Sequence, residues 1–159
     1  MKCIENIFIM ALKIASLNIN GLNNVKKQME LLYFVKYHKI DILLLQEHNV
    51  KDIKSLFYIQ QHFEVILNPT ACLKGGTLVL VSKYVPVDII SKEMDTDGRI
   101  IGIKIYYCGK HLFLLNVYAP SGTNKKKERE EFFIDKILYF LRHNLDNVFL
   151  GDDFSCIIY

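Results

Sequence analysis

The chain has 159 residues, of which 51% are hydrophobic and 23% are charged. This length and composition exclude a disordered chain and fit one domain with its own hydrophobic core. With 20 Lys and Arg residues against 17 Asp and Glu residues, the formal net charge is +3, which permits a polyanionic partner without arguing for one.

The cysteines and the N-terminal segment exclude further classes. The four cysteines are scattered, and neither a Cys-x-x-Cys pair nor a histidine at metal-ligand spacing accompanies them. A zinc site and a disulfide framework are therefore not expected, and reduced thiols fit the cytoplasm or the nucleus. The apolar stretch before Lys13 is too short for a secretory signal, and no run reaches the roughly 20 apolar residues of a membrane helix.

The first predicted elements alternate between strand and helix. Residues 13–19 (KIASLNI) predict a buried strand that ends at an Asn-Gly turn pair. Residues 25–38 carry apolar side chains at helical spacing. Residues 41–47 (DILLLQE) form a continuous apolar run, typical of a strand covered on both faces. Residues 52–61 predict a short helix.

The middle of the chain is rich in predicted strands, at residues 63–68, 77–82, 86–91, 99–107 and 111–120. The last two are joined by a short Cys-Gly-Lys turn and predict a hairpin. Thr123 or Asn124 can cap a second long helix that runs to about His143, and residues 147–153 predict the last strand. Helices on both sides of a β-rich centre indicate an α/β domain with a mixed sheet.

Polar residues gather where the predicted strands end, as Asn18 and Asn20, Gln46 and Glu47, Asn116 and Tyr118, and Asp152 and Asp153. Strand ends that meet at one edge of a sheet are where α/β proteins build their sites. The Glu47 carboxylate either binds a metal there or emerges into solvent. Glu47 and one of the two adjacent aspartates could together hold Mg²⁺, which often takes one or two carboxylates and keeps several waters.

Each remaining candidate residue also has an interpretation in which it plays no part in catalysis or binding. Asn18 and Asn20 also fit an ordinary Asn-Gly turn. Tyr118 could donate to a phosphate oxygen or be a common strand tyrosine, and Arg99 could bind a phosphate or lie on a strand surface. The lysines at 125–127 could touch a nucleic-acid backbone or simply be solvated.

Five segments, in this order, resemble the successive motifs of the endonuclease/exonuclease/phosphatase superfamily: KIASLNINGL, DILLLQEH, DGRIIGIKI, LFLLNVYAPSG and VFLGDDFSCII. The similarity is greatest to the apurinic/apyrimidinic-type, exonuclease III-like endonuclease domain of non-LTR retrotransposons. It covers residues 12–159, leaving 1–11 as a leader extension with Met1 or Met10 as the start. It implies a DNase I-like, four-layer αββα sandwich, present here as an incomplete N-terminal portion.

The resemblance also implies an activity and a set of roles. The activity would be Mg²⁺- or Mn²⁺-dependent cleavage of DNA phosphodiesters, with DNA and a downstream reverse-transcriptase portion of a parent polyprotein as partners and no membrane. By motif, the metal ligands would be Glu47 and Asn18, the catalytic residues Asn18, Tyr118, Asp153 and Ser155, and the substrate-phosphate contacts Asn20, Arg99 and Asn116.

Two departures from the family pattern weaken the implied activity. Ser155 stands where the motif has asparagine, and Asp152 stands where glycine is common. A serine hydroxyl is shorter than an amide and carries one proton, and the loss of one transition-state donor slows a reaction by about two to three orders of magnitude. The family's Ser-Asp-His motif has no counterpart here. Of the histidines, His48 beside Glu47 is the one to test.

These departures leave three functions open. The first is an endonuclease impaired by truncation and by Ser155. The second is a non-catalytic remnant of the same fold that binds nucleic acid or another protein. The third, within the superfamily, is a phosphatase of inositol phosphates or sphingolipids. The motif around Tyr118 resembles the DNA-cleaving branch more closely, so the first is preferred to the third.

Overall fold

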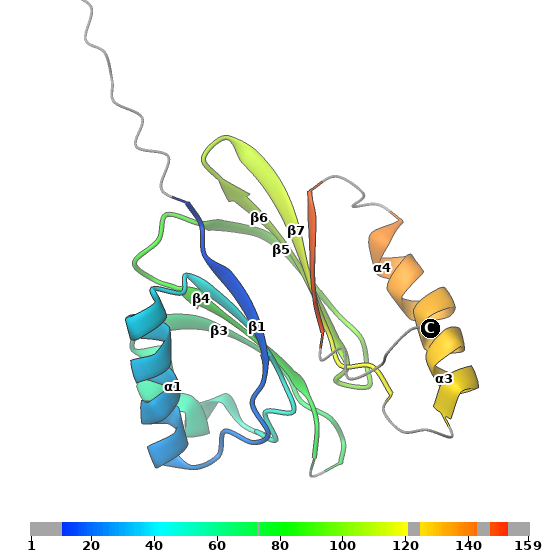
Figure 1. Ribbon diagram of the computed structural model, residues 1–159, viewed down its shortest axis with the longest axis horizontal. Coiled ribbons are helices and arrows are strands. Elements are labelled where there is room, and N and C mark those ends of the chain that lie inside the picture. Colours follow the sequence, from blue (N-terminus) through cyan, green and yellow to red (C-terminus); the bar gives the residue numbers. More distant parts are fainter. Residues whose placement is uncertain (1–10, 73, 121–124, 143–146, 153–159) are drawn as a thin grey trace, which may run out of the picture.

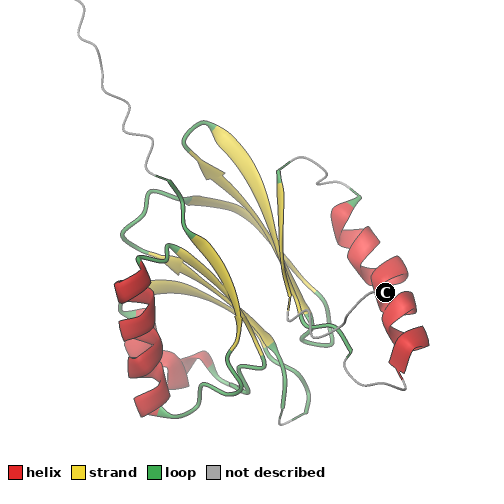
Figure 2. Ribbon diagram, viewed as in Figure 1, coloured by secondary structure: helices red, strands yellow, loops and turns green. Residues whose placement is uncertain are grey.

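The computed structural model describes residues 11–72, 74–120, 125–142 and 147–152. Within these residues, two four-stranded sheets pack face to face and helices cover the outer face of each sheet (Figures 1 and 2). The four-layer α/β sandwich predicted from the sequence is thereby confirmed. No helix in these ranges is both long and apolar enough to cross a membrane.

The first sheet contains β1 (Ile14–Asn18), β2 (Ile42–Gln46), β3 (Phe63–Asn68) and β4 (Thr77–Ser82), in the order β1-β2-β4-β3. β1 and β2 are parallel, whereas β4 runs antiparallel to both of its neighbours. All five residues of β2 are buried, because helices cover one face of the sheet and the second sheet covers the other. This explains the continuous apolar run in its sequence.

The second sheet contains β5 (Asp88–Met94), β6 (Ile100–Tyr107), β7 (Lys110–Val117) and β8 (Val148–Asp152), in that order. β6 and β7 form the predicted hairpin. Cys108 and Gly109 make its two-residue turn, with φ angles of +47° and +80°. Such a turn matches the right-handed twist of the paired strands. β8 returns parallel to β7.

The helices form the two outer layers. α1 (Val25–His38), η1 (Ile53–Leu56) and α2 (Phe57–Gln60) lie on the first sheet, and α3 (Lys126–Glu131), η3 (Phe132–Ile137) and α4 (Leu138–Leu141) lie on the second. The last three follow one another without a break, and η3 is a π-helical stretch. Asn24 caps α1 by accepting a hydrogen bond from the Lys26 N–H. The cap predicted at Thr123 or Asn124 lies outside the described residues.

Three hydrophobic cores separate the four layers. Along β2, Leu43 and Leu45 pack into the core beneath α1, whereas Ile42 and Leu44 pack into the core between the sheets. The same alternation points Gln46 toward the second sheet. On β7, Leu114 faces the first sheet, so the alternation directs Asn116 toward it as well. Two polar side chains therefore enter the space between the sheets at the same end.

Candidate active site

Two buried amides join the sheets directly behind the polar strand ends. Gln46 Nε2 donates to Asn116 Oδ1 at 2.7 Å, and Asn116 Nδ2 donates to the carbonyl oxygens of Leu45 and Leu78, both at 3.0 Å. Both amide side chains are fully buried. We call these three hydrogen bonds the amide clasp, because they tie β7 of the second sheet to β2 and β4 of the first.

The amide clasp changes the role of Asn116. Both of its amide hydrogens are donated inside the protein, and none of its surface is exposed. Because an amide has only two hydrogens to donate, nothing remains to bind a phosphate. We therefore correct the sequence-based prediction that Asn116 contacts the substrate: it joins the sheets.

Asn18 and Glu47 come together where β1 and β2 end. The parallel pairing sets Asn18 opposite Gln46, and Asn18 Nδ2 donates to Glu47 Oε1 at 2.9 Å. Asn18 Oδ1 accepts the backbone N–H of Asn20 at 3.0 Å, which fixes the orientation of the amide. The convergence of these two side chains was predicted from their positions at strand ends.

The backbone at Glu47 is held in a rare conformation. Its φ angle of +55° lies in the left-handed region, which is costly for a residue with a side chain. Two backbone hydrogen bonds hold it there: the Glu47 N–H donates to the Gly76 carbonyl at 3.0 Å, and the Glu47 carbonyl accepts from the Gly21 N–H at 2.6 Å. The carboxylate is half-buried, and these two hydrogen bonds fix the backbone from which it projects.

Gly75 and Gly76 lie close to both Glu47 and Tyr118. Gly76 binds the Glu47 backbone, and a Cβ on Gly75 would lie 3.4 Å from Tyr118 Cε1. A Cβ on Gly76 would lie 2.2 Å from His48 Nε2, and the φ angle of Gly76 is +93°. Sequence reasoning missed this pair, although two adjacent glycines before a strand were an available signal for a close backbone approach.

His48 supports the segment after β2 and is not placed to act as a base. Its Nδ1 accepts the Val50 N–H at 2.9 Å, and its Nε2 lies 3.4 Å from the Asn68 carbonyl oxygen. Burial lowers the pKa of His48 to about 4, so the ring is neutral at neutral pH. The imidazole fills a closed space under Gly76.

Tyr118 and Arg99 form a pair on the second sheet. The Tyr118 N–H donates to the Arg99 carbonyl at 2.8 Å, and Arg99 Nη1 donates to the Tyr118 carbonyl at 3.1 Å. The guanidinium carbon lies 5.4 Å from the centre of the tyrosine ring, within range of a cation–π interaction. Asp95 Oδ1 accepts the Arg99 N–H at 2.8 Å. Arg99 therefore helps to fix the orientation of Tyr118.

The other predicted site residues lie at the ends of β1 and β8 or outside the described residues. Asn20 is exposed in the turn after β1, and its carbonyl accepts from Lys27 Nζ at 2.7 Å. Asp152 is half-buried at the end of β8, opposite Val117. Asp153 and Ser155 lie outside the described residues, so their predicted roles stay predictions.

The lysines at the start of α3 make local ion pairs. Lys125 Nζ lies 3.2 Å from Glu128 Oε2, and Lys127 Nζ lies 3.7 Å from Glu131 Oε1. All four side chains are substantially exposed. Such pairs are common on a solvated helix and contribute little to stability, so this geometry favours the solvated alternative for Lys125 and Lys127.

The chemistry of the donor set fits a hard divalent cation. Among the described residues, no group of three or more His, Cys, Asp or Glu side chains could hold a metal ion. A single carboxylate, Glu47, beside the Asn18 amide fits Mg²⁺ or Mn²⁺, because such ions accept few protein oxygens and keep several waters.

The chain resembles known proteins in sequence and in fold. No family model matches the sequence. The chain is 26% identical over 148 residues to the transposon TX1 uncharacterized 149 kDa protein of Xenopus laevis, covering 92% of this chain and 11% of that protein. It is 32% identical over 117 residues to an exodeoxyribonuclease of Bacillus subtilis (strain 168), covering 70% of this chain and 44% of that one. TDP2 from Caenorhabditis elegans superposes with a TM-score of 0.69 at 23% identity, covering 92% of this chain and 48% of the other.

These relatives and structural neighbours support an endonuclease/exonuclease/phosphatase superfamily domain. The superfamily predicted from the five sequence motifs is thereby confirmed, and so is its DNase I-like arrangement of two packed sheets. The superfamily domain seen here spans less than half the length of the exodeoxyribonuclease and of C. elegans TDP2, at 44% and 48%.

Replacement of Gly76 by alanine tests the close approach beside Glu47. The added Cβ would collide with His48 and take a disfavoured φ angle, so we expect a loss of about 3 kcal/mol in the free energy of unfolding. Gly109→Ala is the matched control, because its φ of +80° is similar and nothing lies within 4 Å of its Cβ. It should lose only about 1 kcal/mol. Equal losses in urea denaturation would show that the His48 contact is unimportant.

Replacement of Asn116 by leucine tests the amide clasp. The substitution removes three hydrogen bonds and leaves Gln46 Nε2 without its buried acceptor on the second sheet, so we expect a loss of about 3 kcal/mol in the free energy of unfolding. Ser16→Ala, which removes only the other acceptor of Gln46 Nε2, should lose about 1 kcal/mol. An Asn116→Leu variant as stable as the parent chain in urea would contradict the clasp.

Proposed function

We propose that this chain takes part in the Mg²⁺- or Mn²⁺-dependent hydrolysis of DNA phosphodiester bonds, as an endonuclease of the retrotransposon type. The observation that supports this most directly is the hydrogen bond between Asn18 and Glu47 at the converging strand ends. The Gly75-Gly76 segment binds the Glu47 backbone through Gly76 and lies close to the Tyr118 ring at Gly75. The relatives named as an exodeoxyribonuclease and a transposon protein support a nucleic-acid substrate.

The first group of roles concerns the metal and its ligands. A bound divalent cation would offset charge on the phosphoryl oxygens and on the leaving group. Glu47 would hold this ion through a carboxylate whose position is fixed by its strained backbone. Asn18 would keep the Glu47 carboxylate oriented through the 2.9 Å hydrogen bond and would lie next to the ion.

The second group of roles concerns the phosphate. The Tyr118 hydroxyl would donate to a non-bridging oxygen, where a fixed donor stabilises the charge that develops in the transition state. Arg99 would position Tyr118 through the stacked guanidinium and would add positive charge beside the substrate. The exposed Asn20 would contact the phosphate backbone at the rim. Asp153 would orient or deprotonate the attacking water, with Ser155 as a weak donor beside it.

A second candidate function keeps the fold without the catalysis. Ser155 replaces the asparagine of the family motif, and a serine hydroxyl is shorter than an amide and carries only one proton. A remnant with these features would bind nucleic acid, or a downstream reverse-transcriptase portion of a parent polyprotein, without cleaving DNA. Either role would place the protein in the nucleus or the cytoplasm.

Plasmid nicking separates the two functions. Purified chain is incubated with supercoiled plasmid in Mg²⁺, and nicked circles are quantified. We expect Glu47→Ala to lower the rate by about two orders of magnitude or more, because the carboxylate that holds the ion is lost. Glu30→Ala is the matched control, since Glu30 is an exposed α1 residue paired with Lys26, and it should nick at the parental rate.

Two outcomes would contradict catalysis by this site. One is equal nicking by the parent chain and Glu47→Ala, which would identify a contaminating nuclease. The other is nicking that persists when the divalent cation is chelated. Salt-sensitive DNA binding without nicking would support the non-catalytic alternative.

A further inference from the structure

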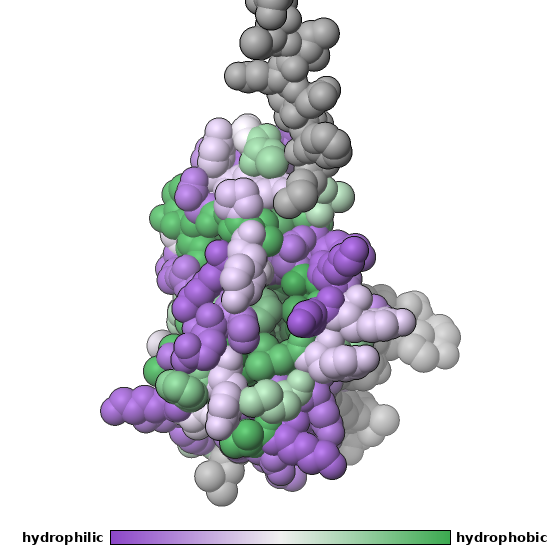
Figure 3. Space-filling view, turned by 90° about the vertical axis from the view of Figure 1, so that its left-hand side faces the viewer, coloured by the Kyte–Doolittle hydropathy of each residue, from purple (hydrophilic) through white to green (hydrophobic). Residues whose placement is uncertain are grey.

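A groove of about 640 Å³ lies beside α1, away from the site around Glu47. It is lined by residues next to the start of β2 and β3 and the end of β4, including Asp41, Phe63 and Ser82. Glu47 follows the opposite end of β2. Five strand residues at about 3.3 Å each separate the two places by roughly 17 Å. On the α1 side, Figure 3 shows a hollow with hydrophobic residues at its bottom and hydrophilic residues around it.

The groove lies where the helical layer of the first sheet is thin. This layer contains α1, with 14 residues, whereas the consecutive η1 and α2 have only four residues each. Strands are spaced by about 4.8 Å and a helix with its side chains is about 10 Å wide. Four strands therefore have room for two long helices side by side. Only one long helix is present among the described residues that cover this sheet.

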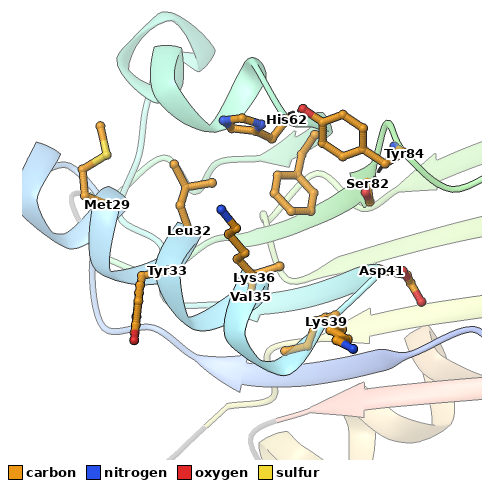
Figure 4. Close-up of a pocket in the computed structure, with 12 residues that line it drawn as sticks. Met29, Leu32, Tyr33, Val35, Lys36, Lys39, Asp41, His62, Ser82 and Tyr84 are labelled. Atoms are coloured by element: carbon orange, nitrogen blue, oxygen red, sulfur yellow. Dashed lines mark hydrogen bonds between the residues drawn. The ribbon is translucent and has the colours of Figure 1, made fainter.

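Large side chains with apolar surfaces line the groove and remain open to solvent. Met29 is 42% exposed, Tyr33 71% and Tyr84 74%. His62 Nδ1 and the Tyr84 hydroxyl are 2.9 Å apart, which holds the wall opposite α1 in place. Figure 4 shows Met29 and Leu32 on one side and His62 and Tyr84 on the other. Exposed apolar surface of this kind commonly marks a protein interaction site.

The charge around the groove is positive. Lys36 and Lys39 line it, both are exposed, and neither ammonium has a hydrogen-bond or ion-pair partner among the described residues. Figure 4 shows Lys36 projecting from α1 between the two walls. Lys13 Nζ donates to the His38 carbonyl close by, whereas the acidic lining residue Asp41 already accepts the Lys13 N–H. The groove therefore complements a partner with an apolar face and acidic flanks.

We propose that the groove binds an amphipathic helix of another protein, with its apolar face on the groove and its acidic residues against Lys36 and Lys39. A helix laid in an apolar groove is a recurrent mode of peptide recognition. It would complete the thin helical layer over the first sheet. A single nucleic-acid strand needs a basic track along its backbone, whereas this lining is mostly apolar.

The test uses two synthetic helical peptides with the same leucines at positions i, i+3, i+4 and i+7. One carries glutamates at the remaining positions and the other carries lysines, and each is labelled with fluorescein. Fluorescence anisotropy with the full chain should show about tenfold tighter binding of the acidic peptide. The double variant Lys36→Glu/Lys39→Glu should weaken that binding by about tenfold and reverse the preference between the peptides.

Matched controls locate the binding at the groove. Lys26→Glu/Lys110→Glu makes the same charge change at exposed lysines outside the groove lining and should leave the preference unchanged. Met29→Gln should weaken the acidic peptide several-fold through lost apolar contact, with circular dichroism confirming that each variant is folded. Glu47→Ala should bind the peptide like the parent chain, which separates this proposal from the nuclease.

Three results would overturn the proposal. The first would be an acidic peptide that binds no better than the lysine peptide. The second would be a control variant, Lys26→Glu/Lys110→Glu, that changes the preference as much as Lys36→Glu/Lys39→Glu does. The third would be a labelled single-stranded oligonucleotide that displaces the peptide from the parent chain and binds Lys36→Glu/Lys39→Glu more weakly. That result would assign the groove to nucleic acid.

Discussion

The amide clasp is the interaction on which the arrangement of the candidate site depends. The core between the sheets is apolar, and hydrophobic contact is non-directional, so it brings the sheets together without fixing their register. The hydrogen bonds of Asn116 to Gln46 and to the Leu45 and Leu78 carbonyls are directional and buried. A relative slip of the sheets would leave these groups unpaired, at a cost of about 1–3 kcal/mol each.

The residues of the amide clasp are next to candidate site residues in the sequence. Glu47 directly follows Gln46, and Tyr118 lies two residues after Asn116, so each clasp residue sits just before a candidate site residue. The Gly75-Gly76 segment binds the Glu47 backbone and lies close to the Tyr118 ring. The strain at Glu47 is sustained because the surrounding contacts over-determine its position.

Much of the fold could be predicted because its signals are local. The continuous apolar run of β2 indicates a strand covered on both faces, and the Cys-Gly-Lys turn indicates the β6–β7 hairpin. The meeting of Asn18 with Glu47 also follows from polar residues at the ends of neighbouring strands. These inferences need the order of residues along one segment and little else.

The site features that the sequence predicts wrongly or not at all depend on contacts between distant segments. A polar residue near a strand end looks the same in sequence whether it faces solvent or the opposite sheet, so Asn116 was assigned to the substrate. The fit of His48 under Gly76 joins two segments that share no local pattern. The groove beside α1 is likewise invisible in the sequence, because it exists only where α1 meets the residues around His62 and Tyr84.

The most direct test of the account is whether both sheets contribute to one divalent-cation site. Mn²⁺ is titrated into isotope-labelled chain, and paramagnetic broadening of backbone amide signals is followed by NMR. We predict that Ile19 and Gly76 beside Glu47, and Tyr118 from the second sheet, broaden first and most, while Lys36 and Tyr84 at the opposite end of the first sheet broaden last and least. Broadening that spares Tyr118, or that spreads evenly over the surface, would contradict a shared site.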